Sequence, residues 1–230
     1  MENLAPYVPV VFVCTVALTL FLFLKATHMN WRVLLVILPW MALQAALTLN
    51  GFYEDTSTVP PRFPLGILPT VLLIVLLFIL PSGRRWIDGL DLKWLTLLHV
   101  VRIPVEIVLL WLHLAAWIPV EMTFEGRNFD ILSGITAPIV FYFSFVRKRM
   151  GRGLLLAWNI LCLLLLINIV THAVLAFPSP FQQIGFDMPN RGVLHFPFNW
   201  LPNVVVPLVL FSHLASIRRL LRSAPEGSPA

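Results

Sequence analysis

Charged residues are scarce in this chain, and their scarcity excludes most classes of soluble protein. They make up 12% of the 230 residues, against about 25% in ordinary globular domains. Hydrophobic residues make up 59%, and the mean hydropathy is +0.87. The net charge of +5 does not indicate a nucleic-acid-binding surface, because the basic residues lie in short clusters between apolar runs. The composition therefore predicts an integral membrane protein.

Cysteine is nearly absent too, and the common catalytic motifs are missing. Cys14 and Cys162 are the only cysteines and both lie within apolar runs, so neither a structural disulfide nor a zinc knuckle is expected. The chain contains no GxSxG nucleophile motif, no glycine-rich phosphate loop and no CxxC pair. The sequence identifies no catalytic residue. It does not decide whether the protein is an enzyme, but it favours a protein that is not one.

Seven apolar runs are candidates for membrane spans, because a bilayer core of about 30 Å requires about 20 apolar residues. We predict an all-α polytopic transmembrane bundle of seven helices that forms a single domain over residues 1–222. The runs cover residues 5–25, 33–52, 65–81, 93–118, 131–147, 153–176 and 196–217. The third and fifth are short and need flanking residues to cross. Residues 223–230 are predicted to form a disordered cytoplasmic tail. The first ten residues contain no basic residue, so the first run is predicted to be a retained span rather than a signal peptide.

The distribution of basic residues predicts the orientation. If the N-terminus and the loops after spans two, four and six lie on one side, that side holds Arg62, Arg127 and Arg191. The opposite side holds Lys25, Arg32, Arg84, Arg85, Lys93, Arg147, Lys148, Arg149, Arg152, Arg218, Arg219 and Arg222. Cytoplasmic loops of membrane proteins carry the excess of Lys and Arg. We therefore predict that the N-terminus lies outside and the C-terminus inside.

Four ionisable residues interrupt the fourth apolar run. At about 100° per residue, His99, Arg102, Glu106 and His113 fall within one arc of about 60°. A charge at the bilayer centre costs about 2.5–3.5 kcal/mol on insertion scales, so this stripe is predicted to face the bundle. Arg102 and Glu106 are four residues apart and are expected to form an ion pair. The stripe is either a structural clamp between helices or an intramembrane site for a ligand, proton or cofactor.

Histidines and asparagines on other spans extend this stripe. The directions of the spans place His99 and His213 in one layer, and His113 and His172 in another about 21 Å away. The fourteen-residue spacing of His99 and His113 resembles that of membrane b-type cytochromes, which would imply haem b or a metal ion. The spacing does not recur on a second helix, and no glycine on the span leaves room for a porphyrin. Asn168 and Asn203 are further candidates for the polar site.

Two loops on the predicted outer side, residues 119–131 and 177–200, carry further polar residues. The candidates for a metal or cation site there are Glu121, Glu125, Asp130, Asp187 and His195. Carboxylates and imidazole are suitable ligands, but the spacing of these residues is not diagnostic of any metal.

Proline recurs within the predicted spans, at Pro39, Pro69, Pro104, Pro138, Pro202 and Pro207. Each proline removes a backbone donor and tends to kink its helix. Membrane helices tolerate such prolines, so the kinks have either no function or the function of opening a cavity near the middle of the membrane.

The region from about Leu92 to Leu220 contains the strings RIPVE, MTFEGRNFDILSGITAP, PSPFQQ and LFSHLAS. In these it resembles a group of uncharacterised bacterial multi-pass inner-membrane proteins with no known activity. The resemblance implies location in the bacterial inner (plasma) membrane. The last span lacks the lysine of microbial rhodopsins and the paired HxxxH of seven-helix zinc hydrolases.

Three functions remain open at this point. The first is a polar intramembrane site that binds, senses or conducts a small solute or protons. The second is a redox or metal protein that uses the histidines. The third is a non-catalytic membrane partner subunit whose polar core is structural. The expected partners are the lipid bilayer and a small solute or proton, and no nucleic acid is expected. The sequence identifies neither a protein partner nor an oligomer.

Overall fold

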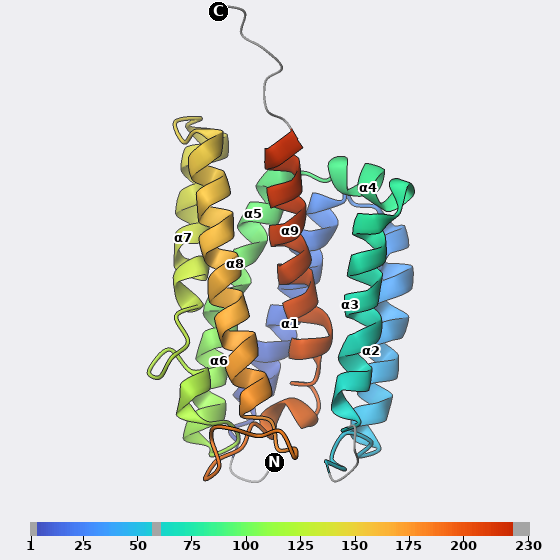
Figure 1. Cartoon of the computed structure of the whole chain (residues 1–230), viewed down its shortest axis with the longest axis vertical. Coiled ribbons are helices and arrows are strands. Elements are labelled where there is room, and N and C mark those ends of the chain that lie inside the picture. The colour runs from blue at the N-terminus through green and yellow to red at the C-terminus, as the bar shows by residue number, and fades with distance from the viewer. Residues whose placement is uncertain (1–3, 57–60, 223–230) are drawn as a thin grey trace, which may run out of the picture.

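The computed structural model describes residues 4–56 and 61–222, and over these residues the protein contains helices but no β-strand. The long helices run along the long axis of one bundle, and the short α4 (Pro81–Asp88) lies across its upper end (Figure 1). The start of α1 and the end of α9 lie at opposite ends of that bundle. The tail that was predicted to be disordered, residues 223–230, lies outside the described residues.

Helical segments occupy all seven predicted runs. Four of the described elements are uninterrupted α-helices: α1 (Tyr7–Ala26), α3 (Phe63–Ile79), α4 (Pro81–Asp88) and α8 (Arg152–Leu175). The other helices combine α-helix with short 3-10 or π segments, which are labelled η. Two of them are η1 (Trp31–Val33) with α2 (Leu34–Leu49), and α5 (Leu92–Leu98) continued through η2 (His99–Val101) into α6 (Arg102–Leu114). The other two are α7 (Ile131–Phe141) with η4 (Tyr142–Val146), and η6 (Leu201–Val205) with α9 (Val206–Arg222). The connecting loops contain the 3-10 turns η3 (Val120–Met122) and η5 (Gly192–Leu194).

Five of these helices are long and apolar enough to cross a membrane: α1, η1 with α2, α5 through α6, α8, and η6 with α9. The pair α3 and α4 raises the number to six if it is counted as one span, although it bends by 87°. Leu80 is extended at this bend, and Pro81 begins α4. Gly83 allows the close return, because a Cβ there would lie 2.4 Å from the carbonyl oxygen of Leu77.

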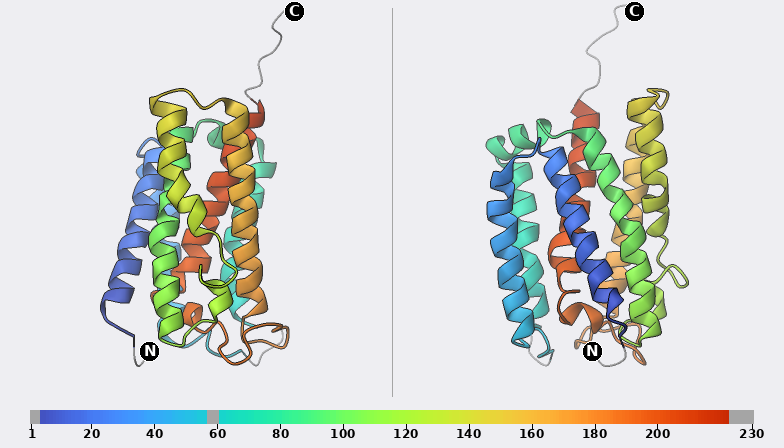
Figure 2. Two further views of the ribbon diagram at one scale, coloured as in Figure 1. Left: turned by 90° about the vertical axis from the view of Figure 1, so that its left-hand side faces the viewer. Right: turned by 180° about the vertical axis from the view of Figure 1, so that it is seen from behind.

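The remaining apolar helix, α7 with η4, starts part of the way along the bundle rather than at its end. Its 16 residues, Ile131–Val146, span about 24 Å, which is less than a bilayer core. The chain between η3 and α7 therefore runs back along the side of the bundle, between α6 and α8 (Figure 2). Gly126 lets this segment turn closely over η3, since a Cβ there would lie 2.1 Å from the carbonyl oxygen of Val120. We call residues 123–130 the return loop.

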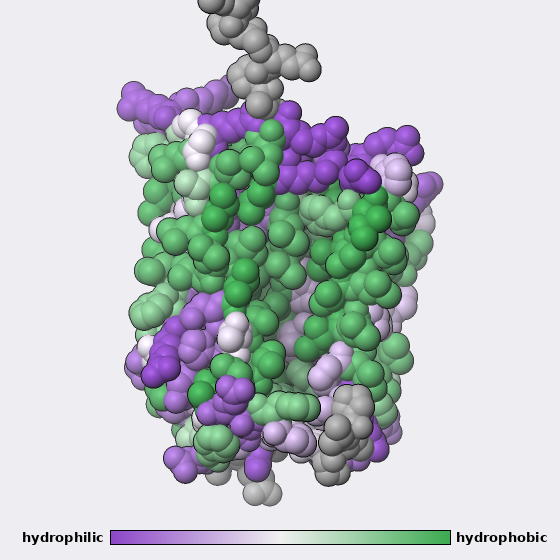
Figure 3. All heavy atoms as spheres, in the orientation of Figure 1, coloured by the Kyte–Doolittle hydropathy of each residue, from purple (hydrophilic) through white to green (hydrophobic). Residues whose placement is uncertain are grey.

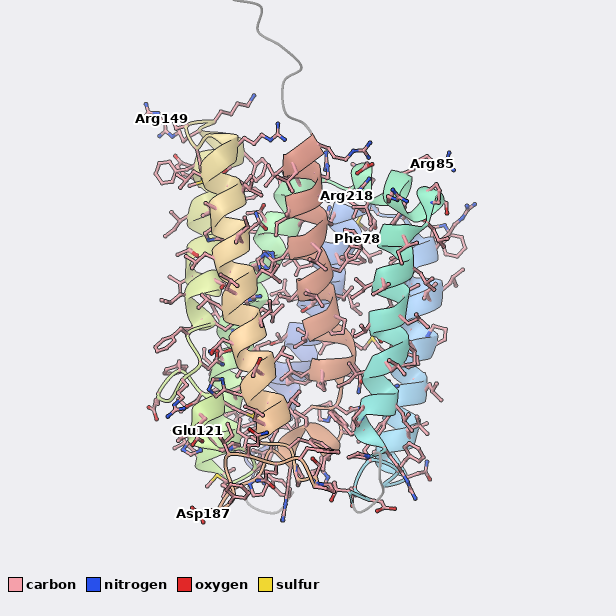
Figure 4. The ribbon with its side chains drawn as sticks, viewed as in Figure 1. Phe78, Arg85, Glu121, Arg149, Asp187 and Arg218 are labelled. Atoms are coloured by element: carbon pink, nitrogen blue, oxygen red, sulfur yellow. The ribbon has the colours of Figure 1, made fainter. Side chains whose placement is uncertain are left out.

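The two ends of the bundle differ in charge, and an apolar belt separates them. Figure 3 shows the belt between a strongly hydrophilic upper end and a mixed lower end. Arg85, Arg149 and Arg218 lie at the upper end, whereas Glu121 and Asp187 lie at the lower end (Figure 4). Arg85, Arg149 and Arg218 belong to the basic residues that the sequence analysis assigned to one side of the membrane.

An ion pair network ties α4 to the end of α9. Arg218 donates from Nε and Nη2 to the carboxylate of Asp88 at 2.9 and 3.1 Å, and Arg222 contacts the same carboxylate. The hydrogen bond from Arg218 lowers the pKa of Asp88 below its ordinary value. Asp88 therefore stays ionised at neutral pH and holds the bend after α3 against α9.

Candidate functional site

Arg102 is buried in the centre of the bundle, and its charge is matched by Asp130 of the return loop. Its Nη1 donates to Asp130 Oδ1 at 2.7 Å and to the carbonyl oxygen of Cys162 on α8 at 3.3 Å. Arg102 is 2% exposed and Asp130 is 4% exposed. Because both charges are withdrawn from water, their mutual attraction must offset two desolvation penalties. The pair connects α6, the return loop and α8.

The expected ion pair between Arg102 and Glu106 is therefore not the one that forms. Both oxygens of Glu106 instead accept from Asn128 Nδ2, at 2.7 and 2.6 Å. Over the described part of the chain, Glu106 has no basic side chain within the 4.0 Å that defines an ion pair. Sequence proximity on one helix could not reveal this, because a loop from elsewhere supplies a better placed partner for each charge.

The sequence Asn-Phe-Asp delivers both partners. Asn128 donates to Glu106 and to the carbonyl oxygen of Met122 at 3.0 Å, while its Oδ1 accepts from the backbone N–H of Asp130 at 3.0 Å. This local bond is an Asx turn, a common way to fix the entry into a helix. Asn168 of α8 adds a bond from Nδ2 to the carbonyl oxygen of Arg127 at 2.8 Å. The return loop is thus held from three sides.

His99 and His213 form a second buried polar pair beside Arg102. They are the pair expected in one layer from the span directions, and their rings stack with centroids 3.7 Å apart and planes inclined by 12°. His213 Nδ1 donates to Asn159 Oδ1 at 3.1 Å, which leaves Nε2 as the acceptor. Trp158 packs edge-on against His99, with centroids 5.6 Å apart.

This stacking does not fit the haem hypothesis. Two axial ligands approach iron from opposite faces with their ring nitrogens pointing at each other. Rings in face-to-face contact leave no space between them for a metal or a porphyrin. His113 and His172 are engaged separately, through bonds of Nδ1 to the carbonyl oxygens of Ile118 at 3.0 Å and Asn168 at 2.9 Å.

The outer-loop candidates do not come together. Among residues 4–56 and 61–222, no three His, Cys, Asp or Glu side chains are grouped so that they could hold a metal ion. Asp130 turns inward to Arg102, whereas Glu125 and Asp187 are exposed. His195 lies 3.4 Å from Glu54, and burial lowers the pKa of its imidazole. Glu121 is half-buried near the lower end of the bundle (Figure 4).

We call Arg102, Asp130, Glu106 and Asn128 the Arg102 cluster. A cavity of about 600 Å³ lies between α3, α6 and α8 and reaches two residues of this cluster, Glu106 and Asp130. Leu68 and Val71 form part of one wall, and Val170 and Val174 form part of the opposite wall. Glu106 and Asp130 are the charged residues that line it. Figure 3 shows the face of the molecule hollowed between α8 and α3.

Asn203 belongs to a separate polar group around Gly66. Its Nδ2 donates to the carbonyl oxygen of Asn199 at 2.9 Å, and its own carbonyl oxygen accepts from Trp40 Nε1 at 3.2 Å. A Cβ at Gly66 would lie 2.6 Å from Tyr53 Oη and 3.1 Å from Asn203 Oδ1, so a larger residue would displace one of these polar groups. Asn203 also borders a second, largely apolar cavity of about 540 Å³, which is lined in addition by Pro39, Pro69 and Pro207.

Asn128 is the residue of the Arg102 cluster that the sequence did not predict. The available signal for Asn128 was the shortness of the fifth apolar run together with the polar string GRNFD directly before it. A run too short to cross the membrane indicates that the preceding loop enters it.

Gly134 provides a test of the close approach that carries Asp130 to Arg102. A Cβ at this position would lie 2.8 Å from Ile103 Cγ1 and 2.9 Å from the backbone nitrogen of Ile103. We expect Gly134→Ala to lower the free energy of unfolding by about 1–3 kcal/mol through overpacking, measured as a lower melting temperature in detergent. Gly153→Ala is the control, because a Cβ at Gly153 meets no atom within 4 Å. Equal melting temperatures for the two variants would contradict the close approach.

Comparison with known proteins places the chain in one family. Residues 64–221 match the family model described as a domain of unknown function, DUF8737. No curated protein matches the chain, and no solved structure matches it. The matched region covers more than half of the chain and contains α3 through α9 almost entirely, including the Arg102 cluster and the cavity beside it. The chain therefore belongs to the DUF8737 family.

Proposed function

We propose that this protein is a seven-span membrane protein of the bacterial plasma membrane that binds, senses or conducts a small solute or protons. Its site is centred on Arg102 and Glu106. The spans are α1, α2, α3, α5 through α6, α7, α8 and α9, with the N-terminus outside and the C-terminus inside. The shorter α3 and α7 count as spans in this topology, because their flanking segments, α4 and the return loop, complete the path across the bilayer.

The position of Glu106 carries this proposal. Asp130 matches the charge of the buried guanidinium through Nη1, while Nε and Nη2 of Arg102 have no hydrogen-bond partner. Glu106 is therefore not needed to neutralise this charge. Glu106 nevertheless lines the cavity of about 600 Å³. An ionised carboxylate is costly in such a place, and ionisable residues within membrane spans therefore usually have a function. Ligand sites have this form, with mostly apolar walls and a few placed polar groups.

The alternative functions are less well supported. A redox protein would need the histidines to face a cofactor, and His99 and His213 instead face each other. A purely structural polar core explains Arg102 and Asp130 but gives no reason for a second carboxylate, Glu106, on a cavity wall.

Matched neutral substitutions of the two carboxylates separate a binding site from a structural clamp. Asp130→Asn removes the countercharge of buried Arg102, and we expect a loss of about 3–5 kcal/mol in stability. Glu106→Gln removes no ion pair and keeps an oxygen that can accept from Asn128, so we expect an unchanged or higher melting temperature. Thermal unfolding in the same detergent measures both. A loss for Glu106→Gln as large as that for Asp130→Asn would show that Glu106 is structural.

The topology is tested with reporter fusions. Green fluorescent protein fused after Arg222 is expected to fluoresce, since it folds in the cytoplasm. Alkaline phosphatase inserted at the exposed Asp187 is expected to be active, because this loop faces outward in the proposed topology. Alkaline phosphatase inserted at Lys148 is the control and is expected to be inactive. Activity at Lys148 together with inactivity at Asp187 would contradict the orientation.

A further inference from the structure

Four polar residues line the cavity beside Arg102 in the described part of the chain: Glu106, Asp130, Asn190 and Ser179. The hydroxyl oxygen of Ser179 accepts from the backbone N–H of Phe181, so the groups left to receive a ligand are mainly the carboxylates and Asn190. Asn190 is 2% exposed; its Nδ2 donates to the carbonyl oxygen of Ala173 at 3.2 Å, and its Oδ1 has no hydrogen-bond partner. A buried acceptor without a donor costs about 1–3 kcal/mol. The cavity therefore presents oxygen acceptors and calls for a ligand that donates.

The charge of the site indicates that this donor is cationic. Arg102 is matched one to one by Asp130 and does not line the cavity. An ionised Glu106 then leaves one negative charge in a medium of low dielectric constant, held only by the amide of Asn128. An ammonium group would supply both the missing charge and N–H donors, and such charge-assisted bonds are about twice as strong as neutral ones. A carboxylate or phosphate would be repelled.

The walls indicate an apolar body and entry from the lipid. The volume of about 600 Å³ falls within the range of about 300–1,000 Å³ of small-molecule sites. Leu68 and Val71 on α3 are 61% and 39% exposed, and Val170 and Val174 on α8 are 37% and 62% exposed. These side chains line the cavity and also face outward, so the gap between α3 and α8 opens toward the hydrocarbon of the bilayer.

We propose that this cavity binds a lipophilic amine, which enters from the bilayer between α3 and α8 and places its ammonium group at Glu106. The proposal rests on the function proposed above, because it assigns the ligand of the same site. It excludes an anionic amphiphile of the same length, and it ranks a neutral alcohol below the amine.

The test uses the full-length protein in lipid nanodiscs and three amphiphiles with the same chain: decylamine, 1-decanol and decanoate. A primary alkyl ammonium stays charged well above neutral pH. Thermal unfolding as a function of amphiphile concentration gives the affinity of each. We expect decylamine to raise the melting temperature, 1-decanol to bind at least about tenfold more weakly, and decanoate to give no shift.

Three variants assign the effect to this cavity. Glu106→Gln is expected to weaken decylamine binding at least about tenfold and to abolish the preference over 1-decanol. Val170→Trp narrows the entrance and is expected to weaken binding of both. Leu161→Trp on α8 is the control, because Leu161 is 59% exposed but does not line the cavity.

The proposal is overturned if decylamine gives no shift, if decanoate or 1-decanol binds as tightly as decylamine, or if Glu106→Gln keeps full affinity for the amine. The proposed function is tested separately, by the melting temperature of Glu106→Gln without ligand. That measurement does not depend on any of these binding results.

Discussion

The need to compensate the buried charge of Arg102 determines much of this structure. An arginine cannot lose its charge in a protein, and Arg102 is 2% exposed within a helix long and apolar enough to cross a membrane. Its countercharge comes from Asp130, on a segment that must leave the lower end of the bundle and run back into it. The short α7, the close turn at Gly126 and the missing Cβ at Gly134 all follow from that path. Asn128 fixes the end of the path and holds Glu106 at the same time.

Pairing Arg102 with Asp130 has a consequence for Glu106. Since the cation is already matched, Glu106 becomes a carboxylate without a countercharge on the wall of an apolar cavity. A polar core built only for stability would leave no such group, because a buried charge destabilises unless it is paired. We interpret Glu106 as a group whose partner arrives with the ligand, and Asn190 as a second acceptor for the same molecule.

The sequence predicted the helices well and the loops poorly, for identifiable reasons. Apolar runs located the long helices to within a few residues, except that the last helix begins at Leu201 rather than at 196. They did not predict the short α4, which lies between the third and fourth runs and is rich in polar residues. Phe198 and Asn199 just before it are buried in a loop, and hydropathy does not distinguish a buried loop from a helix. Helical phase correctly predicted that His99, Arg102 and Glu106 are buried. It could not predict their partners, because Asn128 and Asp130 reach them through the return loop rather than along the helix.

A double-mutant cycle on Arg102 and Asp130 tests the central claim most directly. The measurement is the free energy of unfolding of Arg102→Leu, Asp130→Leu and the double variant, with a parallel cycle on Arg102 and Glu106. We expect each single variant to lose about 3–5 kcal/mol, because it leaves one buried charge uncompensated, and the double variant to recover most of that loss. Additive losses for Arg102 and Asp130, together with strong coupling between Arg102 and Glu106, would contradict the account.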